Sequence, residues 1–217
     1  MEGVNAGDHK ISANNNFELG FKIIKYGKSN NMKKTGPGTI KITSGELKRR
    51  NIKTPGGGTH PMGERERLAL FNMISEKLPG ATILDAYAGS GALGLEAISR
   101  GAKKVCFIEK AKKAIEIIRG NCLTLNIQED KTSFFLGSVN KYYEKFKEEP
   151  HLKDIILADP PYDDLNVEEI SLLTHFLKPS GIFVLSHPGA SPIFSGLELL
   201  KTQKYASAHL SIYKKLG

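Results

Sequence analysis

Hydrophobic residues in the last two-thirds of the chain form short continuous runs, and segments with helical spacing separate these runs. The runs predict buried strands at 81–86, 104–108, 133–136, 154–158 and 181–185. The segments between them predict helices at 92–100, 110–125, 139–146 and 167–177. Apolar strands that alternate with amphipathic helices are typical of an α/β protein with a parallel sheet covered on both faces. Two more strands within 198–213 complete a mostly parallel, seven-stranded sheet whose last pair is antiparallel.

The chain before this alternation has a different pattern. Strand-like pieces at 39–43 and 51–53, joined by a basic turn, predict a small β-hairpin, and a Gly-rich loop at 55–59 follows. Apolar residues at helical spacing then predict a helix over 64–77. Residues 1–36 are rich in Asn, Lys, Gly and Ser and show little periodicity, so we expect a flexible basic extension there.

Positive charge is concentrated at the N-terminal end and changes this picture. Residues 1–63 hold eleven Lys and Arg against four Asp and Glu, which is nearly all of the net charge of +8. Lys48, Arg49, Arg50 and Lys53 form a local cluster in the predicted hairpin. Such a segment attracts phosphate backbones of any sequence. A solvated basic tail is an equal alternative on charge alone.

Other features of the composition argue against membrane, secreted and metal-binding classes. No apolar run reaches the length of about 18 residues that a membrane span needs. The first ten residues are polar, unlike a signal peptide. The two cysteines, Cys106 and Cys122, lack metal-ligand spacing. We therefore expect a cytoplasmic protein with reduced thiols, no metal site and no membrane partner.

A glycine motif lies where the strand at 81–86 gives way to the next helix. It reads Asp85-Ala-Tyr-Ala-Gly89-Ser-Gly91-Ala-Leu-Gly94. Glycines there allow a sharp turn and close approach of a ligand to the backbone, and the helix offers unpaired N–H groups. Glu109, at the end of the next strand, can accept two hydrogen bonds from a ribose diol.

The same spacing of glycines also occurs in dinucleotide-binding proteins, so a nicotinamide cofactor is the first alternative. Asp85 stands four residues before Gly89, close enough to meet an ammonium group. A carboxylate at this place would repel the phosphates of a dinucleotide. The motif therefore favours S-adenosylmethionine.

The tetrad Asp159-Pro160-Pro161-Tyr162 follows the strand at 154–158 directly. Methylation of an exocyclic amine needs acceptors for its N–H groups and an in-line position for its nitrogen. The Asp159 carboxylate and the Pro160 carbonyl, in a turn made rigid by proline, can be those acceptors. Tyr162 can stack on a flipped or unpaired base. A plain Pro-Pro loop is the alternative, which the full tetrad after a strand disfavours.

The segment 83–102 resembles the cofactor motif of the bacterial 16S ribosomal RNA guanine-N2 methyltransferases of the RsmD type. Ser44-Gly45 with the basic residues 48–50, and the stretch from His60-Pro61-Met62 to Leu70-Phe71-Asn72, are similar to further elements of that family. The likeness covers roughly residues 39–213. It implies a Rossmann-like class I methyltransferase fold, with 37–217 as the methyltransferase domain: a hairpin and loop at 37–60 and a catalytic core at 61–217.

The resemblance implies that Asp85, Gly89, Gly91 and Glu109 bind S-adenosylmethionine, and that Asp159 and Tyr162 handle the target base. Three positions depart from the family pattern. Ser138 stands where the family has an acid near the adenine, and we expect its hydroxyl to make that hydrogen bond. His60 and Met62 replace an Arg and a Thr.

Arg65 and Arg67 lie in the predicted helix that follows the basic hairpin, and both can be ordinary solvated charges. Phosphate binding is the favoured reading for Arg65, and we expect RNA contacts from Lys48, Arg49, Arg50 and Arg65. His187 has no assigned role. The hairpin is expected to sit beside the active-site cleft.

These observations predict transfer of a methyl group from S-adenosylmethionine to guanine N2 of 16S rRNA, within a small-subunit assembly particle and without an obligate protein partner. A methyltransferase acting on adenine N6 of DNA or RNA needs the same tetrad and is the first alternative. A glutamine-amide methyltransferase is disfavoured, because that group has Asn in place of Asp159. A non-catalytic RNA-binding or ribosome-assembly factor that retains the fold is the alternative from another class.

Overall fold

The computed structural model describes residues 38–56, 62–205 and 208–217. Its strands are β1 (Gly38–Lys41), β2 (Asn51–Thr54), β3 (Thr82–Ala86), β4 (Lys104–Glu109), β5 (Thr132–Leu136), β6 (Lys153–Ala158), β7 (Leu177–His187), β8 (Leu197–Lys204) and β9 (His209–Lys215). Its α-helices are α1 (Glu64–Met73), α2 (Ala92–Ser99), α3 (Lys112–Thr124), α4 (Val139–Phe146) and α5 (Val167–Ser171). Short 3₁₀ helices are η1 (Ser75–Lys77), η2 (Glu129–Lys131), η3 (Tyr162–Asp164) and η4 (Leu172–Phe176).

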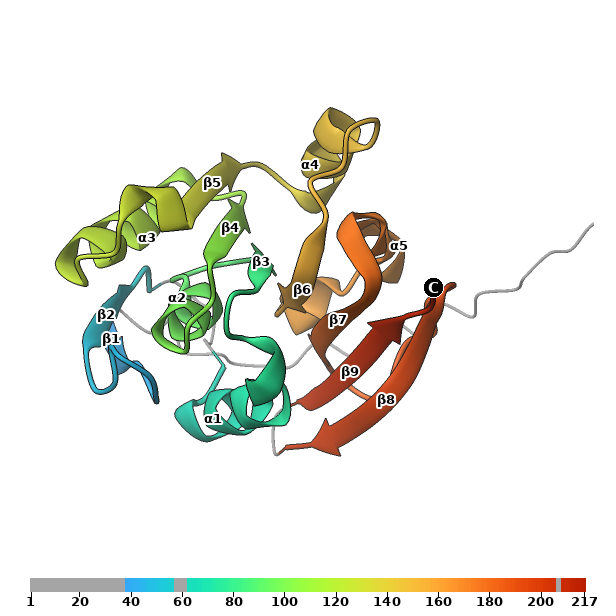
Figure 1. The fold of residues 1–217 in the computed structure, drawn as a ribbon, viewed down its shortest axis with the longest axis horizontal. Helices are drawn as coiled ribbons and strands as arrows, with labels where there is room; N and C mark the ends of the chain where they lie inside the picture. Colours follow the sequence, from blue (N-terminus) through green and yellow to red (C-terminus); the bar gives the residue numbers. More distant parts are fainter. Residues whose placement is uncertain (1–37, 57–61, 206–207) are drawn as a thin grey trace, which may run out of the picture.

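Seven of the described strands form one sheet in the order β5-β4-β3-β6-β7-β9-β8 (Figure 1). The pairs from β5 to β7 are parallel, and β9 runs antiparallel to both β7 and β8. The predicted α/β fold with an antiparallel end is thus confirmed. The strand order reverses between β3 and β6, because the chain crosses from β5 at the edge of the sheet back to β6 beside β3. Open α/β sheets bind ligands beyond the carboxyl ends of the strands at such a point.

The sheet has a hydrophobic core on each face, because its central strands alternate their buried side chains between the two faces. Ile83 packs in the core with α1, α2 and α3, whereas its neighbour Leu84 packs in the core with α4 and α5. Figure 1 shows α4 and α5 together on one side and the other helices with the hairpin. This arrangement leaves the loops at the carboxyl edge of the sheet to form the site.

Three predicted elements have a bound that differs from the structure by more than two residues. The helix at 64–77 stops as an α-helix at Met73, because Ile74 has a non-helical backbone with φ −114° and ψ 15°. The helix at 167–177 continues beyond Ser171 as 3₁₀ structure. The strand at 181–185 begins earlier, at Leu177, because an irregularity around Ser180 (φ 60°) lets Leu177 pair with Lys153 and Ile182 with Ile155.

The predicted hairpin is confirmed as β1 and β2, and it packs on α2 and α3. The Glu46 N–H donates to the Ser99 carbonyl at 2.8 Å, and a Cβ added to Gly45 would lie 1.8 Å from the same oxygen. Arg50 donates to the Thr124 carbonyl at 3.0 Å. The basic turn therefore lies at the C-terminal ends of α2 and α3. The glycine loop lies at the other end of α2, which is about 12 Å long. The predictions for residues 1–36 and for His60 lie outside the described residues.

No helix in the described part of the chain combines the length and the apolar character needed to cross a bilayer.

Candidate active site

The glycine loop between β3 and α2 has a backbone that few residues other than glycine adopt. Gly89 and Gly91 have φ of 55° and 78°, and Gly91 is the N-cap of α2. Among the described residues, an added Cβ at Gly89 would have the Tyr87 carbonyl at 3.9 Å and no other contact within 4 Å. The loop is therefore open where a side chain of residue 89 would lie. Tyr87 itself has φ 60°, an uncommon value for an aromatic residue. Backbone strain of this kind concentrates at binding sites.

Gly94 serves packing, because an added Cβ would lie 2.3 Å from the Phe107 ring and 2.8 Å from Val105. We expect Gly94→Ala to lower the free energy of unfolding by about 1–3 kcal/mol through overpacking between α2 and β4. Gly120→Ala on α3 is the matched control, because nothing lies within 4 Å of its added Cβ and alanine favours the helix. Urea denaturation measures both, and equal stability of the two variants would contradict this packing role.

Glu109 fastens the end of β4 to the glycine loop. Its Oε2 accepts a hydrogen bond from the Gly89 N–H at 2.9 Å, and its Oε1 accepts one from the Ala111 N–H at 2.8 Å. Each carboxylate oxygen has a second acceptor position. Glu109 can therefore order the loop and still accept hydrogen bonds from a diol.

Asp85 is buried at the end of β3, and its Oδ2 accepts a hydrogen bond from the Gly94 N–H at 2.8 Å. Burial raises the pKa of Asp85 well above its usual value, the hydrogen bond from Gly94 opposes this, and the charges of Asp159 and Glu109 add to it. The tie from Asp85 to α2 was not predicted from sequence. The charges of Asp159 and Glu109 both act on Asp85, so a positively charged ligand beside Asp85 would be favoured.

Asp159 follows β6, beside the glycine loop, because Ala158 of β6 pairs with Ala86 of β3. The Ser186 hydroxyl and the Met62 N–H are the hydrogen-bonding groups that favour its ionised form. Burial raises the pKa of Asp159 to about 6, the charge of Glu66 adds to the rise, and the two hydrogen bonds oppose it. Asp159 is therefore ionised at neutral pH but close to its titration range.

Tyr162 is anchored by a hydrogen bond to Ser186, since the Tyr162 hydroxyl lies 2.5 Å from Ser186 Oγ. Burial raises the pKa of Tyr162, so it stays protonated. Ser186 was missed from sequence, although its place at the end of an apolar strand beside His187 was a usable signal.

Ser138 follows β5 and is the N-cap of α4, where its Oγ accepts from the Lys141 N–H at 3.3 Å. This bond leaves the hydroxyl proton for another acceptor. The Gly137 N–H donates to the Glu109 carbonyl at 2.9 Å, which brings this loop next to Glu109.

The structure separates the predicted RNA-binding residues into two places. Lys48, Arg49 and Arg50 are exposed in the hairpin turn, where Arg50 also caps α3 as described above. Arg65 is exposed in the first turn of α1. Arg67, expected as a solvated charge, is buried, because it lies on the inner face of α1.

The strand order and the residues gathered at its carboxyl edge define a protein of the class I methyltransferase fold. A family model described as "Conserved hypothetical protein 95" matches residues 40–214. Ribosomal RNA small subunit methyltransferase D of Haemophilus influenzae is 30% identical over 162 residues, which cover 73% of this chain and 83% of that protein. The chain therefore belongs to the family of ribosomal RNA small subunit methyltransferase D.

Solved structures agree with this assignment. The Escherichia coli protein yhhF, provisionally named a methyltransferase, has a TM-score of 0.72 and 25% identity, with 83% of this chain and 99% of that chain covered. SMU.776, which was solved in complex with SAH, shares the fold with a TM-score of 0.64 at 14% identity, with 87% of this chain and 57% of that chain covered.

Proposed function

We propose that this protein transfers a methyl group from S-adenosylmethionine to the exocyclic N2 of a guanine in 16S rRNA. The observation that carries the proposal is the position of the Asp159 carboxylate, directly after β6 and beside the glycine loop that follows β3. The family relatives are named for methylation of small-subunit ribosomal RNA. The choice of guanine N2 rests on the resemblance of the motifs.

The acidic character of the site supports the choice of S-adenosylmethionine over a dinucleotide. Burial raises the pKa of Asp85, and the negative charges of Asp159 and Glu109 raise it further. A ligand with an ammonium and a sulfonium group relieves this repulsion, whereas a diphosphate increases it. Asp85, Gly89, Gly91, Glu109 and Ser138 are the residues that would hold the ligand, and when bound it supplies an electrophilic methyl group.

The chain's own residues would hold and deprotonate the base amine. The ionised Asp159 accepts one N–H of the amine, and the Pro160 carbonyl is available for the other. Tyr162, anchored through its hydroxyl to Ser186, offers its ring for stacking on the base. As the amine nitrogen bonds to the methyl carbon and the carbon–sulfur bond breaks, one N–H proton leaves to Asp159 or to water.

The basic residues would bind the RNA backbone at a distance from the target base. Lys48, Arg49 and Arg50 are exposed at the far ends of α2 and α3, and Arg65 is exposed on α1. Contacts of this kind position the RNA and weaken as salt rises. The RNA that we propose is 16S rRNA, within a small-subunit assembly particle.

The rate of methyl transfer is expected to fall as pH falls through about 6, because the pKa of Asp159 is raised to about 6 and the reaction needs its ionised form. The single-turnover rate measured between pH 5 and pH 8 checks this. Binding of the RNA, measured at each pH at the same salt concentration, is the control. A rate that stays constant down to pH 5 would exclude Asp159 as the acceptor.

Incubation with methyl-labelled S-adenosylmethionine tests the proposal. The substrates are protein-free 16S RNA and small-subunit particles from cells without the modification, with 23S RNA as control. Label retained only by 16S RNA or its particles supports it, and the better substrate of the two shows which form is used. Absence of label in every RNA, together with no heat of S-adenosylmethionine binding by calorimetry, would leave a non-catalytic RNA-binding protein.

A further inference from the structure

Asn121 is a buried polar residue on α3, and its side-chain amide lies between the hairpin and the glycine loop. The residue is 3% exposed. Its Oδ1 accepts a hydrogen bond from the Lys53 N–H at 2.8 Å. Its Nδ2 donates to the Lys53 carbonyl at 3.0 Å and to the Ser90 carbonyl at 3.2 Å. One amide therefore joins three segments that are far apart in the sequence: β2, the glycine loop and α3.

The two bonds to Lys53 fasten the hairpin to α3, and Figure 1 shows the hairpin beside this helix. The hairpin is a sheet of two strands, so backbone groups on the outer edge of β2 need partners elsewhere. Asn121 pairs with both the N–H and the carbonyl of Lys53, as a residue of a neighbouring antiparallel strand would. The place of the hairpin on α3 thus depends on this side chain.

The peptide unit between Ser90 and Gly91 is held at both ends. Its carbonyl accepts from Asn121, and its N–H donates to the Ala88 carbonyl at 2.7 Å. Gly89 and Gly91 flank Ser90, and both have positive φ. Glycine adopts other conformations about as readily, so these two residues oppose a rotation of the peptide unit only weakly. The hydrogen bonds at its two ends therefore fix its orientation.

The glycine loop is anchored by side chains from two elements. Glu109, at the end of β4, accepts from the Gly89 N–H, as described above. On α3, Ile118 lies so close to the loop that a Cβ added to Gly91 would be 3.0 Å from its side chain. Asn121 lies one turn further along α3, on the same face of the helix. Glu109 and Asn121 therefore hold successive peptide units of the loop.

We propose that Asn121 is a positioning residue for S-adenosylmethionine, which acts by fixing the Ser90 carbonyl and with it the conformation of the glycine loop. This inference rests on the cofactor site of the proposed function. A loop that is already ordered loses less conformational freedom when a ligand binds, so the ligand binds more tightly. Because the same amide holds Lys53, the hairpin and the cofactor loop share one anchor.

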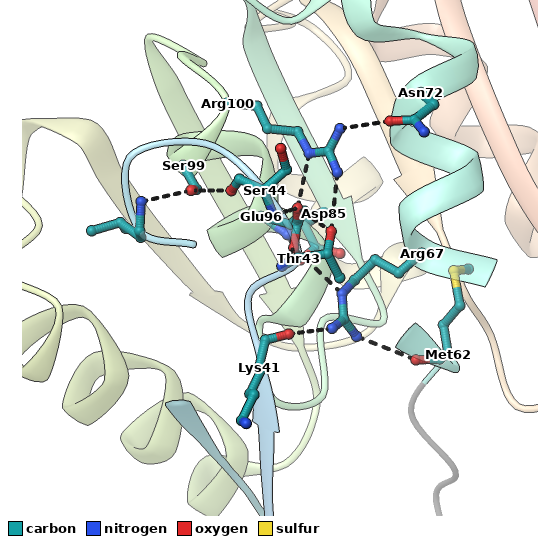
Figure 2. A network of polar contacts seen from close by, with 12 residues as sticks. Lys41, Thr43, Ser44, Met62, Arg67, Asn72, Asp85, Glu96, Ser99 and Arg100 are labelled. Carbon is teal, nitrogen blue, oxygen red and sulfur yellow. Dashed lines mark hydrogen bonds and ion pairs between the residues drawn. The ribbon is translucent and has the colours of Figure 1, made fainter. Parts of the chain in front are cut away.

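Ser99 provides a matched control, because it fastens the same hairpin at the opposite end of α2 from the glycine loop. Its Oγ accepts from the Leu47 N–H at 2.9 Å and donates to the Ser44 carbonyl at 2.5 Å (Figure 2). Ser99 is also buried. Ser99→Ala therefore removes two hydrogen bonds from the hairpin and leaves the bond between Asn121 and Ser90 intact.

The test measures the affinity of the full chain for S-adenosylhomocysteine (SAH) by calorimetry, without RNA. We expect Asn121→Ala to weaken SAH binding by about three- to tenfold, the range for the loss of one hydrogen bond. Asn121→Leu, which keeps a branched side chain without hydrogen-bonding groups, should weaken it by a similar factor. Ser99→Ala should melt at lower temperature but bind SAH as the wild type does. In methylation assays, the Asn121 variants should raise the KM for S-adenosylmethionine and change kcat little.

Hydrogen exchange followed by NMR provides a second measurement. In the ligand-free protein, the Gly91 amide should exchange faster in the Asn121 variants than in the wild type or in Ser99→Ala, because its peptide unit has lost one anchor. In the wild type, the side-chain amide protons of Asn121 should exchange more slowly when SAH is bound. This last comparison needs no variant, so it decides the inference even if the Asn121 variants do not fold.

Equal SAH affinity in the wild type and the Asn121 variants would overturn the positioning role, and so would an equal loss of affinity in Ser99→Ala. Exchange of the Asn121 amide that SAH does not change would also overturn it. A wild-type protein that methylates no RNA, while SAH binding differs among the variants as expected, would support the role of Asn121 and refute the proposed function alone.

Discussion

Asp159→Asn is expected to lower the single-turnover rate of methyl transfer by about 100- to 10,000-fold, the range for loss of a group that takes part in proton transfer. Asn keeps the shape of the side chain, but its amide cannot take a proton. Stability should not fall, because the raised pKa of Asp159 shows that burial disfavours its charged form. The rate under single-turnover conditions and the melting temperature together check this.

Asp163→Asn is the matched control, because Asp163 is an exposed carboxylate in the same loop. It should keep a rate close to that of the wild type, and both variants should bind S-adenosylmethionine in calorimetry. The expected loss of rate is at least about 100-fold, so a rate for Asp159→Asn within about threefold of that of Asp163→Asn would mean that another group accepts the proton.

Glu96→Gln is expected to lower the free energy of unfolding by about 3–5 kcal/mol, the cost of leaving buried charges unpaired. Arg67 and Arg100 both face the Glu96 carboxylate from buried positions (Figure 2). Glu96 carries the only negative charge in the Glu96 cluster, which consists of Thr43, Ser44, Arg67, Glu96 and Arg100, and Gln removes it. The hydrogen bonds from Thr43 and Ser44 also weaken, because they lose a charged acceptor. Guanidinium denaturation measures the loss.

Glu116→Gln on α3 controls for the loss of a carboxylate at the surface, because Glu116 is exposed. Surface substitutions usually change stability by less than about 0.5 kcal/mol. If Glu96→Gln were as mild, the Glu96 cluster would not be what fastens the hairpin to α1 and α2.

The sheet could be predicted from the sequence because its strands are buried on both faces. Residues 155–158, in the strand predicted at 154–158, are all apolar, and this pattern differs clearly from the helical spacing beside it. The bounds of helices were harder to predict. Ile74 leaves the helical conformation without a Gly or Pro to mark the end, and Pro179 and Ser180, which precede the strand predicted at 181–185, lie within the strand β7.

The motif residues of the candidate site could be found from sequence, but their supporting contacts could not. Ser186, which anchors Tyr162, comes from β7, and only its place near the end of an apolar strand could have indicated it. Arg65 and Arg67 look alike in the sequence, yet side chains two positions apart on an α-helix point about 200° apart around its axis. The first is exposed and the second is buried, and only the packing of α1 decides which.

The identity of the methylated nucleoside decides whether this protein methylates guanine N2. Small-subunit particles without the modification are incubated with the protein and S-adenosylmethionine, the RNA is digested to nucleosides, and the products are separated by mass spectrometry. We expect N2-methylguanosine with the wild type and with Asp163→Asn, and a strongly reduced amount of N2-methylguanosine with Asp159→Asn. N6-methyladenosine as the product would contradict the assignment to guanine N2 while keeping the mechanism, and no methylated nucleoside would contradict the enzyme itself.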